Sequence, residues 1–463
     1  MEMDFQREVC ERLPLAECVL RLGQFVLNDD LLSGVFHEHR GRSYEKVIDF
    51  PLFVRLIGDS LLEHAGNGHQ AFTRARESGE LETSVQAAYG KLQRIPISLS
   101  LGFLVETSAR LREVFPAEVE LPVAKSLRDF TVINIDGKKL KHLPHRLLPT
   151  RKLRGKLLGG KLVVAMDQGT GLTIAMQGVR DGETSDAPLV PGLLAQVRRI
   201  VPTRRLYVED RQFCDLVQPG LLNEGEYFLI RYHPKVSFHR DSSVPVRHGK
   251  TAEGKKYQEE WGWLGLPQDP RRCRVRRITL YRPGMEDVIV VTNLLDADGY
   301  PATDLLQAYL HRWDIETLFQ RVTEVFHLKE LISSTPEATV FQAAYCFLLS
   351  NLITTIRAYL AVQKKREPET ISTYQLQYDV ERELNAWNQL LDTESTLAVL
   401  EKPLTAARLR QHLRRRLSTT WSDRWLKTSA TQHTPVTEKR YIRGGHTSIH
   451  RLQIQAKMKK RRC

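Results

Sequence analysis

Apolar residues recur at helical spacing in the first quarter of the chain. In segments 51–65 and 97–115 they stand three and four positions apart, which predicts amphipathic helices. Near residue 120 this pattern gives way to short runs rich in β-branched residues. We therefore predict a helical domain over 1–120, followed by a region built on a β-sheet.

The region after residue 120 is predicted to form an α/β unit. Residues 187–200 show helical spacing with prolines near the start, which is typical of a helix that begins there. A Gly-containing turn at 168–171 separates two apolar runs, as in a β-hairpin. The predicted strands are 130–136, 161–167, 172–178, 205–210 and 226–232.

The second half of the chain changes character twice. Residues 233–295 are polar, contain Gly and Pro, and end in a predicted hairpin. Helical spacing then returns at 303–326 and continues to about residue 420. The predicted units are the helical domain at 1–120, two parts of an α/β core at 121–232 and 296–375, a β-rich insertion at 233–295, and a helical C-terminal region with a basic tail at 376–463.

The most apolar stretch, 341–362, is long enough to cross a bilayer. It contains Asn351 and Arg357, which are costly inside a membrane, so we predict a buried helix of a soluble protein. The first ten residues are polar and acidic, without the pattern of a signal peptide. No two cysteines stand at C-x-x-C spacing, which is typical of free thiols in the cytoplasm.

The net charge points to a polyanionic partner. The chain has 68 Lys and Arg against 55 Asp and Glu, a net charge of +13. An excess of this sign favours nucleic acid. The segment 439–463 contains Lys and Arg but no Asp or Glu, and such tails often bind phosphate.

Two aspartates stand where a metal site could form. Asp136 and Asp210 each end an apolar run that is predicted to be a strand. If these two strands are parallel neighbours, the carboxylates face each other at the same edge of the sheet. Close carboxylates repel unless they share a proton or a cation, and oxygen ligands suit Mg²⁺ or Mn²⁺.

A third acid is predicted on the helix at 303–326. Tyr309, Arg312 and Glu316 stand three and four residues apart, so a continuous helix would place them on one stripe. Glu316 is then the candidate third metal ligand. The apolar residues of this helix are expected to pack on the sheet: Leu310, Trp313, Ile315, Leu318 and Phe319.

Other interpretations of these acids remain open. An Asp at a strand end is often a turn former or a helix cap. Arg312 and Glu316 could form an ordinary surface ion pair, worth about 0.3–0.5 kcal/mol. Spacing alone leaves Asp167 and Glu209 as alternative ligands.

Three stretches in this order resemble a known family. "INIDG" (133–137), "VEDRQF" (208–213) and "YLHRWDIETLF" (309–319) are similar to the catalytic stretches of the DDE transposases of bacterial insertion sequences. The subgroup is the insertion-sequence-four-like one, with a Tyr-x2-Arg-x3-Glu-x6-Lys signature. The resemblance implies a ribonuclease-H-like catalytic core, a mixed five-stranded sheet with helices, which a β-rich insertion interrupts.

The resemblance also assigns roles to residues. Asp136, Asp210 and Glu316 become the catalytic, metal-binding triad for Mg²⁺ or Mn²⁺, with two ions expected. Tyr309 and Arg312 become contacts to DNA phosphate.

The chain departs from the signature at one position. Thr323 stands where the signature has lysine, so another basic group must supply that phosphate contact or the site is impaired. Relatives cut through a DNA hairpin with the help of a tryptophan of the insertion. Trp261 and Trp263 lie in that region and are predicted to bind DNA, although they could equally pack the insertion.

Basic residues follow the first aspartate directly. Lys138, Lys139 and the stretch 150–156 could bind a DNA backbone beside the acids, with an affinity that falls steeply with salt.

We therefore expect a transposase that acts on DNA in the bacterial cytoplasm, at the nucleoid. It would bind the inverted repeats at the ends of its element, cleave them and join the 3′ ends to target DNA, as at least a dimer in the synaptic complex. The first alternative is a catalytically impaired or domesticated transposase that only binds DNA. The second is a tyrosine recombinase with Tyr309 or Tyr441 as nucleophile, whose reaction needs no metal.

Overall fold

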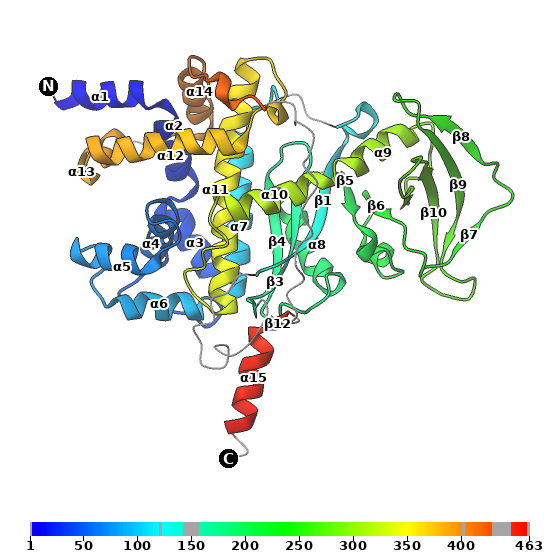
Figure 1. The fold of residues 1–463 in the computed structure, drawn as a ribbon, viewed down its shortest axis with the longest axis horizontal. Helices are drawn as coiled ribbons and strands as arrows, with labels where there is room; N and C mark the ends of the chain where they lie inside the picture. Colours follow the sequence, from blue (N-terminus) through cyan, green and yellow to red (C-terminus); the bar gives the residue numbers. More distant parts are fainter. Residues whose placement is uncertain are drawn as a thin grey trace.

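The fold is a row of three regions along the long axis of the molecule (Figure 1). Helices from both halves of the sequence lie on the left, a sheet with helices around it occupies the centre, and antiparallel strands lie on the right. The computed structural model describes residues 2–119, 123–141, 157–202, 204–400, 403–427 and 446–460.

One mixed sheet of ten strands runs through the centre and the right of the molecule. Its strands are β1 (Phe130–Lys139), β3 (Lys161–Asp167), β4 (Thr173–Val179), β5 (Arg204–Glu209), β6 (Glu226–Arg231), β7 (Phe238–Arg240), β8 (Arg247–Lys250), β9 (Lys256–Leu264), β10 (Cys273–Leu280) and β11 (Val288–Thr292). The order is β4-β3-β1-β5-β6-β11-β10-β9-β7, with β8 also paired to β9. A separate pair joins β2 (Leu157–Leu158) to β12 (Thr447–Ser448).

All five strands predicted before residue 233 are present. Strands β1, β5 and β6 run parallel to one another, whereas β3, β4 and β11 are antiparallel to their neighbours. The segment 233–295 contains strands β7 to β11, which include the predicted hairpin, and its status as an insertion stays a prediction. Its strands continue the central sheet, because β11 pairs with β6.

The predicted end of the first strand at Asp136 is wrong. Strand β1 continues to Lys139 because its pairing with β3 extends to Lys139 opposite Lys161. Its parallel pairing with β5 stops earlier, at Ile135 opposite Glu209. Asp136 therefore lies where β1 loses its neighbour on one side.

Helices cover both faces of the sheet and form the left of the molecule (Figure 1). Alternate residues of β3 face two different layers: Val164 belongs to the core shared with α10 and α11, and Val163 to the core shared with α8. The helices are α1 (Glu2–Arg12), α2 (Pro14–Val26), α3 (Asp29–His39), α4 (Phe50–Leu62), α5 (Gly68–Glu77), α6 (Val85–Arg94), α7 (Ile97–Val114), α8 (Val190–Ile200), α9 (Ala302–Leu310), α10 (Trp313–Glu324), α11 (Pro336–Gln363), α12 (Thr373–Leu390), α13 (Thr393–Leu400), α14 (Ala406–Leu417) and α15 (Ile449–Lys460).

The N-terminal and C-terminal helices share one hydrophobic core around α11. Helix α2 has no side-chain cap of its own at its first turn. Glu383 of α12 accepts hydrogen bonds from the backbone N–H groups of Leu15 (2.7 Å) and Ala16 (3.1 Å) and takes that role. Helices α2 and α12 are thus joined, and the domain boundaries expected near residues 120 and 376 stay predictions.

Helix α11 is the stretch that is apolar enough to span a membrane, and its apolar window is completely buried in the protein. The prediction of a buried helix is therefore confirmed. Its Asn351 bonds the edge strand β4: Oδ1 accepts from Thr173 N and Nδ2 donates to Thr173 O, both at 2.8 Å. Ser108 of α7 also donates to Thr173 O (2.8 Å), so two helices satisfy the backbone of a strand edge.

Replacing Asn351 by leucine should destabilise the protein by roughly 2–4 kcal/mol, because the Thr173 N–H is left buried without a partner. Urea unfolding measures the change. Asn388→Leu, on the exposed face of α12, should change the free energy of unfolding by less than about 0.5 kcal/mol. Equal effects of the two substitutions would contradict this role of Asn351.

Asp59 of α4 should make the stability depend on pH. Burial, and after it the charges of the nearby Glu63 and Glu80, raise the pKa of Asp59 from 3.8 to about 7. The folded protein therefore binds an extra proton between these values, and its stability falls as the pH rises through that window. Asp59→Asn should be more stable than the wild type by roughly 1–3 kcal/mol at pH 8, and equal to it near pH 4. The exposed Asp30→Asn should show no such gain in urea unfolding at either pH.

Candidate active site

The register of β1 and β5 brings the two predicted aspartates together near the carboxyl ends of these neighbouring strands. Ile135 lies opposite Glu209, so Asp136 and Asp210 are the next residues on two parallel strands. Burial raises the pKa of Asp136 to about 6, and the charges of Glu316 and Asp210 also raise it. The Gly137 N–H, which donates to Asp136 Oδ1 (2.7 Å), and the Arg312 guanidinium lower it. The two strand aspartates thus lie within electrostatic reach of each other.

The helix predicted over 303–326 is broken into α9 and α10 at His311 and Arg312. Side chains of the sheet region take the carbonyl oxygens that a continuous helix would use. Gln168 donates to Ala308 O (2.9 Å) and Asn134 donates to His311 O (3.1 Å). The Arg312 N–H bonds Tyr309 O instead (3.0 Å), which tightens this turn to the i→i+3 pattern.

Arg312 lies among the three predicted acids. Its guanidinium is 2.8 Å from Glu316 Oε1 and 3.6 Å from Asp136 Oδ2, and its side chain is 4% exposed. Burial lowers the pKa of Arg312, but the hydrogen bond to Glu316 and the charges of Asp210 and Asp136 outweigh burial and raise it. The structure therefore places Asp136 and Glu316 beside the Arg312 guanidinium, and Asp210 close enough for its charge to act on Arg312.

Tyr309 lies beneath this cluster. It is 3% exposed, and its pKa is raised by burial first and then by the charge of Asp210, against Arg312, which lowers it. Tyr309 and Arg312 are both buried here, and Arg312 contacts the acids. Their contacts with DNA phosphate stay a prediction.

All apolar residues of this helix were expected to pack on the sheet, but only some of them do. Ile315, Leu318 and Phe319 are buried, but Leu310 is 42% exposed and Trp313 is 55% exposed. The prediction was wrong for these two because the break changes the faces that α9 and α10 present. The Trp313 ring lies 5.2 Å from the Arg312 guanidinium carbon, at the acid cluster. The spacing of Trp313 matches that of a core residue, so its exposure beside the acids could not be predicted from the sequence.

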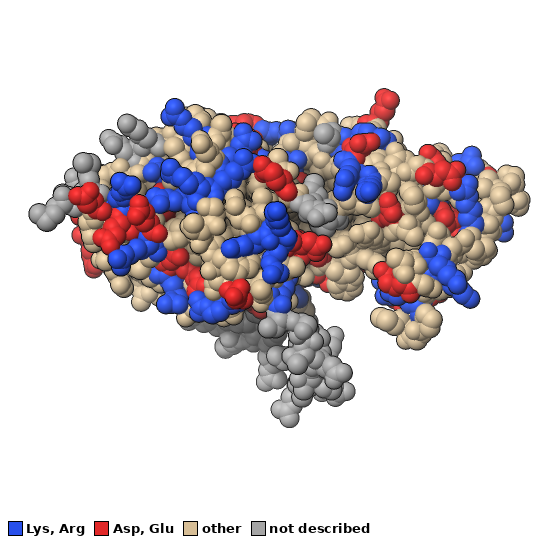
Figure 2. Space-filling view, turned by 90° about the horizontal axis from the view of Figure 1, so that it is seen from above, with Lys and Arg blue, Asp and Glu red and all other residues tan. Residues whose placement is uncertain are grey.

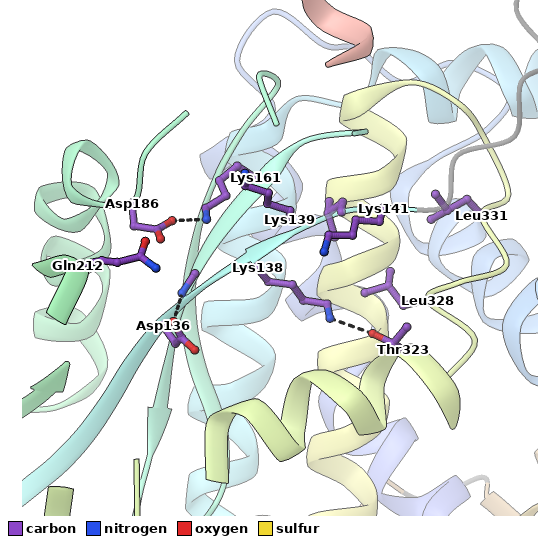
Figure 3. Close-up of a pocket in the computed structure, with 12 residues that line it drawn as sticks. Asp136, Lys138, Lys139, Lys141, Lys161, Asp186, Gln212, Thr323, Leu328 and Leu331 are labelled. Atoms are coloured by element: carbon purple, nitrogen blue, oxygen red, sulfur yellow. Dashed lines mark hydrogen bonds and ion pairs between the residues drawn. The ribbon is translucent and has the colours of Figure 1, made fainter. Parts of the chain in front are cut away.

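A cavity of about 430 Å³ opens beside Asp136 (Figure 3). Lys138 crosses it from β1 and donates to Thr323 Oγ1 (2.8 Å) and Phe319 O (3.1 Å), while Lys139 is exposed. Burial, and after it the charge of Lys141, lower the pKa of Lys138 to about 8, whereas the charge of Asp136 acts to raise it. The described residues that line the cavity are Asp136, Gly137, Lys138, Lys139, Leu140, Lys141, Lys161, Asp186, Gln212, Thr323, Leu328 and Leu331.

The two tryptophans of the insertion do not join this cluster. Both lie on β9, five strand intervals from β1, which is about 24 Å at the usual strand spacing. Trp261 is 7% exposed and donates its indole N–H to Leu295 O (2.9 Å). Trp263 is half-buried, with the guanidinium carbon of Arg272 4.4 Å from its ring. Their role in binding DNA stays a prediction.

The alternative acids face elsewhere. Asp167 pairs with Arg112 of α7 (2.6 Å) and lies opposite Ile133, three residues before Asp136 on β1. Glu209 is buried beside the α8 layer, and burial raises its pKa to about 8, with a further contribution from Asp215. Among the described residues, neither forms an ion pair with Arg312.

A tighter group of metal-ligating side chains lies away from this site. Within the part of the chain that the structure describes, Glu38, His39 and Glu106 are the group whose ligand atoms all lie within 4.8 Å of one another. Arg199 bonds both glutamates, at 2.9 and 3.0 Å, and neutralises their charge. The acids around Arg312 are more widely spaced, with the guanidinium between them. The predicted basic stretch 150–156 lies outside the described residues, as do residues 439–445 and 461–463 of the basic tail.

Comparison with known proteins agrees with this arrangement. Residues 128–352 match the family described as the transposase DDE domain, and the match includes Asp136, Asp210 and Glu316. The match covers nearly half of the chain. Curated proteins give no match. Among solved structures, the chain is similar to the cryo-EM structure of the piggyBac transposase synaptic complex with hairpin DNA, at 10% identity and a TM-score of 0.33, covering 89% of this chain and 88% of that chain. A TM-score this low does not establish a common fold, so the assignment rests on the family match.

Removing the Arg312 cation should make the fold depend on divalent metal. In Arg312→Gln the carboxylates of Asp136, Asp210 and Glu316 repel one another, so we expect a loss of roughly 2–4 kcal/mol without metal. Mg²⁺ or Mn²⁺ should raise the melting temperature of this variant more than that of the wild type.

The matched control is Arg276→Gln, which breaks another buried arginine–glutamate pair, with Glu259, on β10 and β9. This variant should lose stability but respond to metal as the wild type does. An equal metal response of both variants would show that the acids around Arg312 do not form a cation site.

Proposed function

We propose that the protein is a DNA transposase of bacterial insertion sequences. It binds the ends of its element, cleaves the DNA by metal-dependent phosphodiester hydrolysis and joins the 3′ ends to target DNA. The observation that carries this proposal is the convergence of Asp136, Asp210 and Glu316 around Arg312, inside a segment that is a transposase DDE domain. A cluster of acids held at a sheet edge beside lysines suits a reaction on a phosphodiester.

We assign strands β4-β3-β1-β5-β6 to a ribonuclease-H-like core, with the strands of 233–295 as its insertion. The order and directions of these five strands support this assignment. Both catalytic aspartates then come from the central parallel pair, β1 and β5, and the glutamate comes from α10, which packs on β1.

The acid cluster has the donors that Mg²⁺ or Mn²⁺ prefers. All three side chains offer carboxylate oxygens, and their arrangement already stabilises one cation, the Arg312 guanidinium. Asp136, Asp210 and Glu316 would hold the ions, two in number. Bound ions supply activation of a water or a 3′-hydroxyl and stabilisation of the leaving oxygen.

Residues of the chain around the acids prepare the site. Arg312 favours the ionised form of Asp136, because its charge lowers the pKa of that carboxyl group. Lys138 and Lys139 place positive charge where the DNA backbone would approach. The exposed ring of Trp313 offers a surface on which a base can stack.

The surface charge supports DNA as the partner. In Figure 2, Lys and Arg side chains gather over the helices in the left and middle of the face seen from above. Helix α14, at the top of Figure 1, ends in Arg414, Arg415 and Arg416. Because transposition joins two ends, we propose that two or more copies assemble on DNA.

Two other functions receive less support. A transposase that has lost catalysis would explain Thr323, but it would not need three acids arranged around a cation. A tyrosine recombinase would need an accessible nucleophile. Tyr309 is 3% exposed, and Tyr441 lies outside the described residues.

Asp136→Asn should abolish cleavage, by at least about 1,000-fold, because it removes a carboxylate from the cation site. Its affinity for end DNA should stay within about threefold of the wild type. The assay is nicking of a plasmid that carries the inverted repeats flanking the gene, with Mg²⁺ or Mn²⁺, alongside a gel-shift measurement.

Asp298→Asn is the matched control, since Asp298 pairs with Arg247 at the surface of the strand region. This variant should cleave as the wild type does. Full cleavage by Asp136→Asn, or cleavage by the wild type in EDTA with a covalent protein–DNA adduct, would overturn the proposed function.

A further inference from the structure

A lysine–threonine contact joins β1 to α10 beside the acid cluster. Lys138 Nζ donates to Thr323 Oγ1 at 2.8 Å and to Phe319 O at 3.1 Å. The same ammonium lies 5.1 Å from the centre of the Phe319 ring. Figure 3 shows Lys138 reaching from the strand across the cavity to Thr323 on the helix.

The alternation of β1 places Lys138 on the same face as Asp136. Residues two apart on a strand point to the same side. Accordingly, Asn134 donates to His311 O, Asp136 meets Arg312 at 3.6 Å, and Lys138 meets Thr323 further along. One strand face thus follows the helix from its break to its last turn.

The ammonium of Lys138 has neutral hydrogen-bond partners. They are a hydroxyl and a backbone carbonyl, and Lys138 forms no ion pair within the described part of the chain. Lys161, which also lines the cavity, is instead paired with Asp186 at 2.5 Å. The charge of Asp136 favours the ammonium, but it does not offset the cost of burial, so the site favours an additional anion.

The cavity offers that anion a place. An ammonium has three N–H donors, and Lys138 spends two of them on α10, which leaves one for a ligand in the cavity of about 430 Å³. Lys139 and Lys141 line the same cavity, and Asp136 stands at its edge. An anion bound here is therefore a neighbour of the acid cluster.

We propose that Lys138, held in place by Thr323, binds one phosphate of the DNA strand that is cleaved at the acid cluster. The family signature places a lysine at position 323, on α10. In this chain Lys138 on β1 supplies that positive charge instead. Lys138 touches the substrate, and Thr323 is a positioning residue. This inference rests on the proposed function.

The test exchanges the two residues. Lys138→Met should reduce plasmid cleavage roughly 10- to 100-fold, the usual effect of one charged hydrogen bond. The double variant Lys138→Met with Thr323→Lys returns an ammonium to the cavity from the other element. It should cleave within about threefold of the wild type. Lys138→Arg, which keeps the charge, should retain more activity than Lys138→Met.

A binding measurement tests the same contact without cleavage. Fluorescence anisotropy with the duplex of the flanking inverted repeat, in Ca²⁺ and at several salt concentrations, gives the number of phosphate contacts. Lys138→Met should lower the salt slope by about one, and the exchange variant should restore it. Lys255→Met, an exposed lysine beside β9, should match the wild type in both assays.

The outcomes separate this inference from the proposed function. This inference is wrong if cleavage depends on Asp136 but not on Lys138. It is also wrong if the exchange variant has a wild-type melting temperature yet regains neither cleavage nor the salt slope. If the wild type does not cleave at all, the proposed function fails and the salt slopes still decide the contact. If inorganic phosphate binds the wild type but does not compete with DNA, the cavity binds free phosphate. The assignment of Lys138 to a DNA strand is then wrong.

Discussion

Repulsion between like charges is the constraint on which this site depends. Three carboxylates at one edge of a sheet are unstable together unless a cation lies between them. Arg312 meets this requirement in the present structure, with Glu316 at 2.8 Å and Asp136 at 3.6 Å. The break between α9 and α10 sets the position of this guanidinium, and side chains of the sheet region hold the break open. The break in the helix therefore determines where the positive charge lies among the acids.

Strand β1 organises the site because it belongs to two different pairings. It pairs with β5 only as far as Ile135, and with β3 as far as Lys139. Residues 136–139 therefore pair with β3 but not with β5. Asp136 and Lys138 both fall there, so a carboxylate for a cation and an ammonium for an anion lie two residues apart.

The sequence was sufficient for the features that depend on local pattern. Short apolar runs predicted the five strands, and the order of Asp136, Asp210 and Glu316 indicated where acids would meet. Features that depend on distant side chains could not be predicted. The helix break needs Asn134 and Gln168, which are more than a hundred residues away in sequence. The contact of Lys138 with Thr323 could not be read from spacing either, because it joins a strand to a helix packed against it.

The hydrogen bonds between β6 and β11 have a mechanical consequence. An inserted segment tethered only by flexible linkers could rotate freely about its junctions. Here the backbone ladder continues without interruption from the catalytic strands to β9 and β7. Bending it would require breaking several of those bonds at once. The outer strands are therefore coupled to the strands that carry Asp136 and Asp210 by hydrogen bonds between strands, rather than by linkers alone.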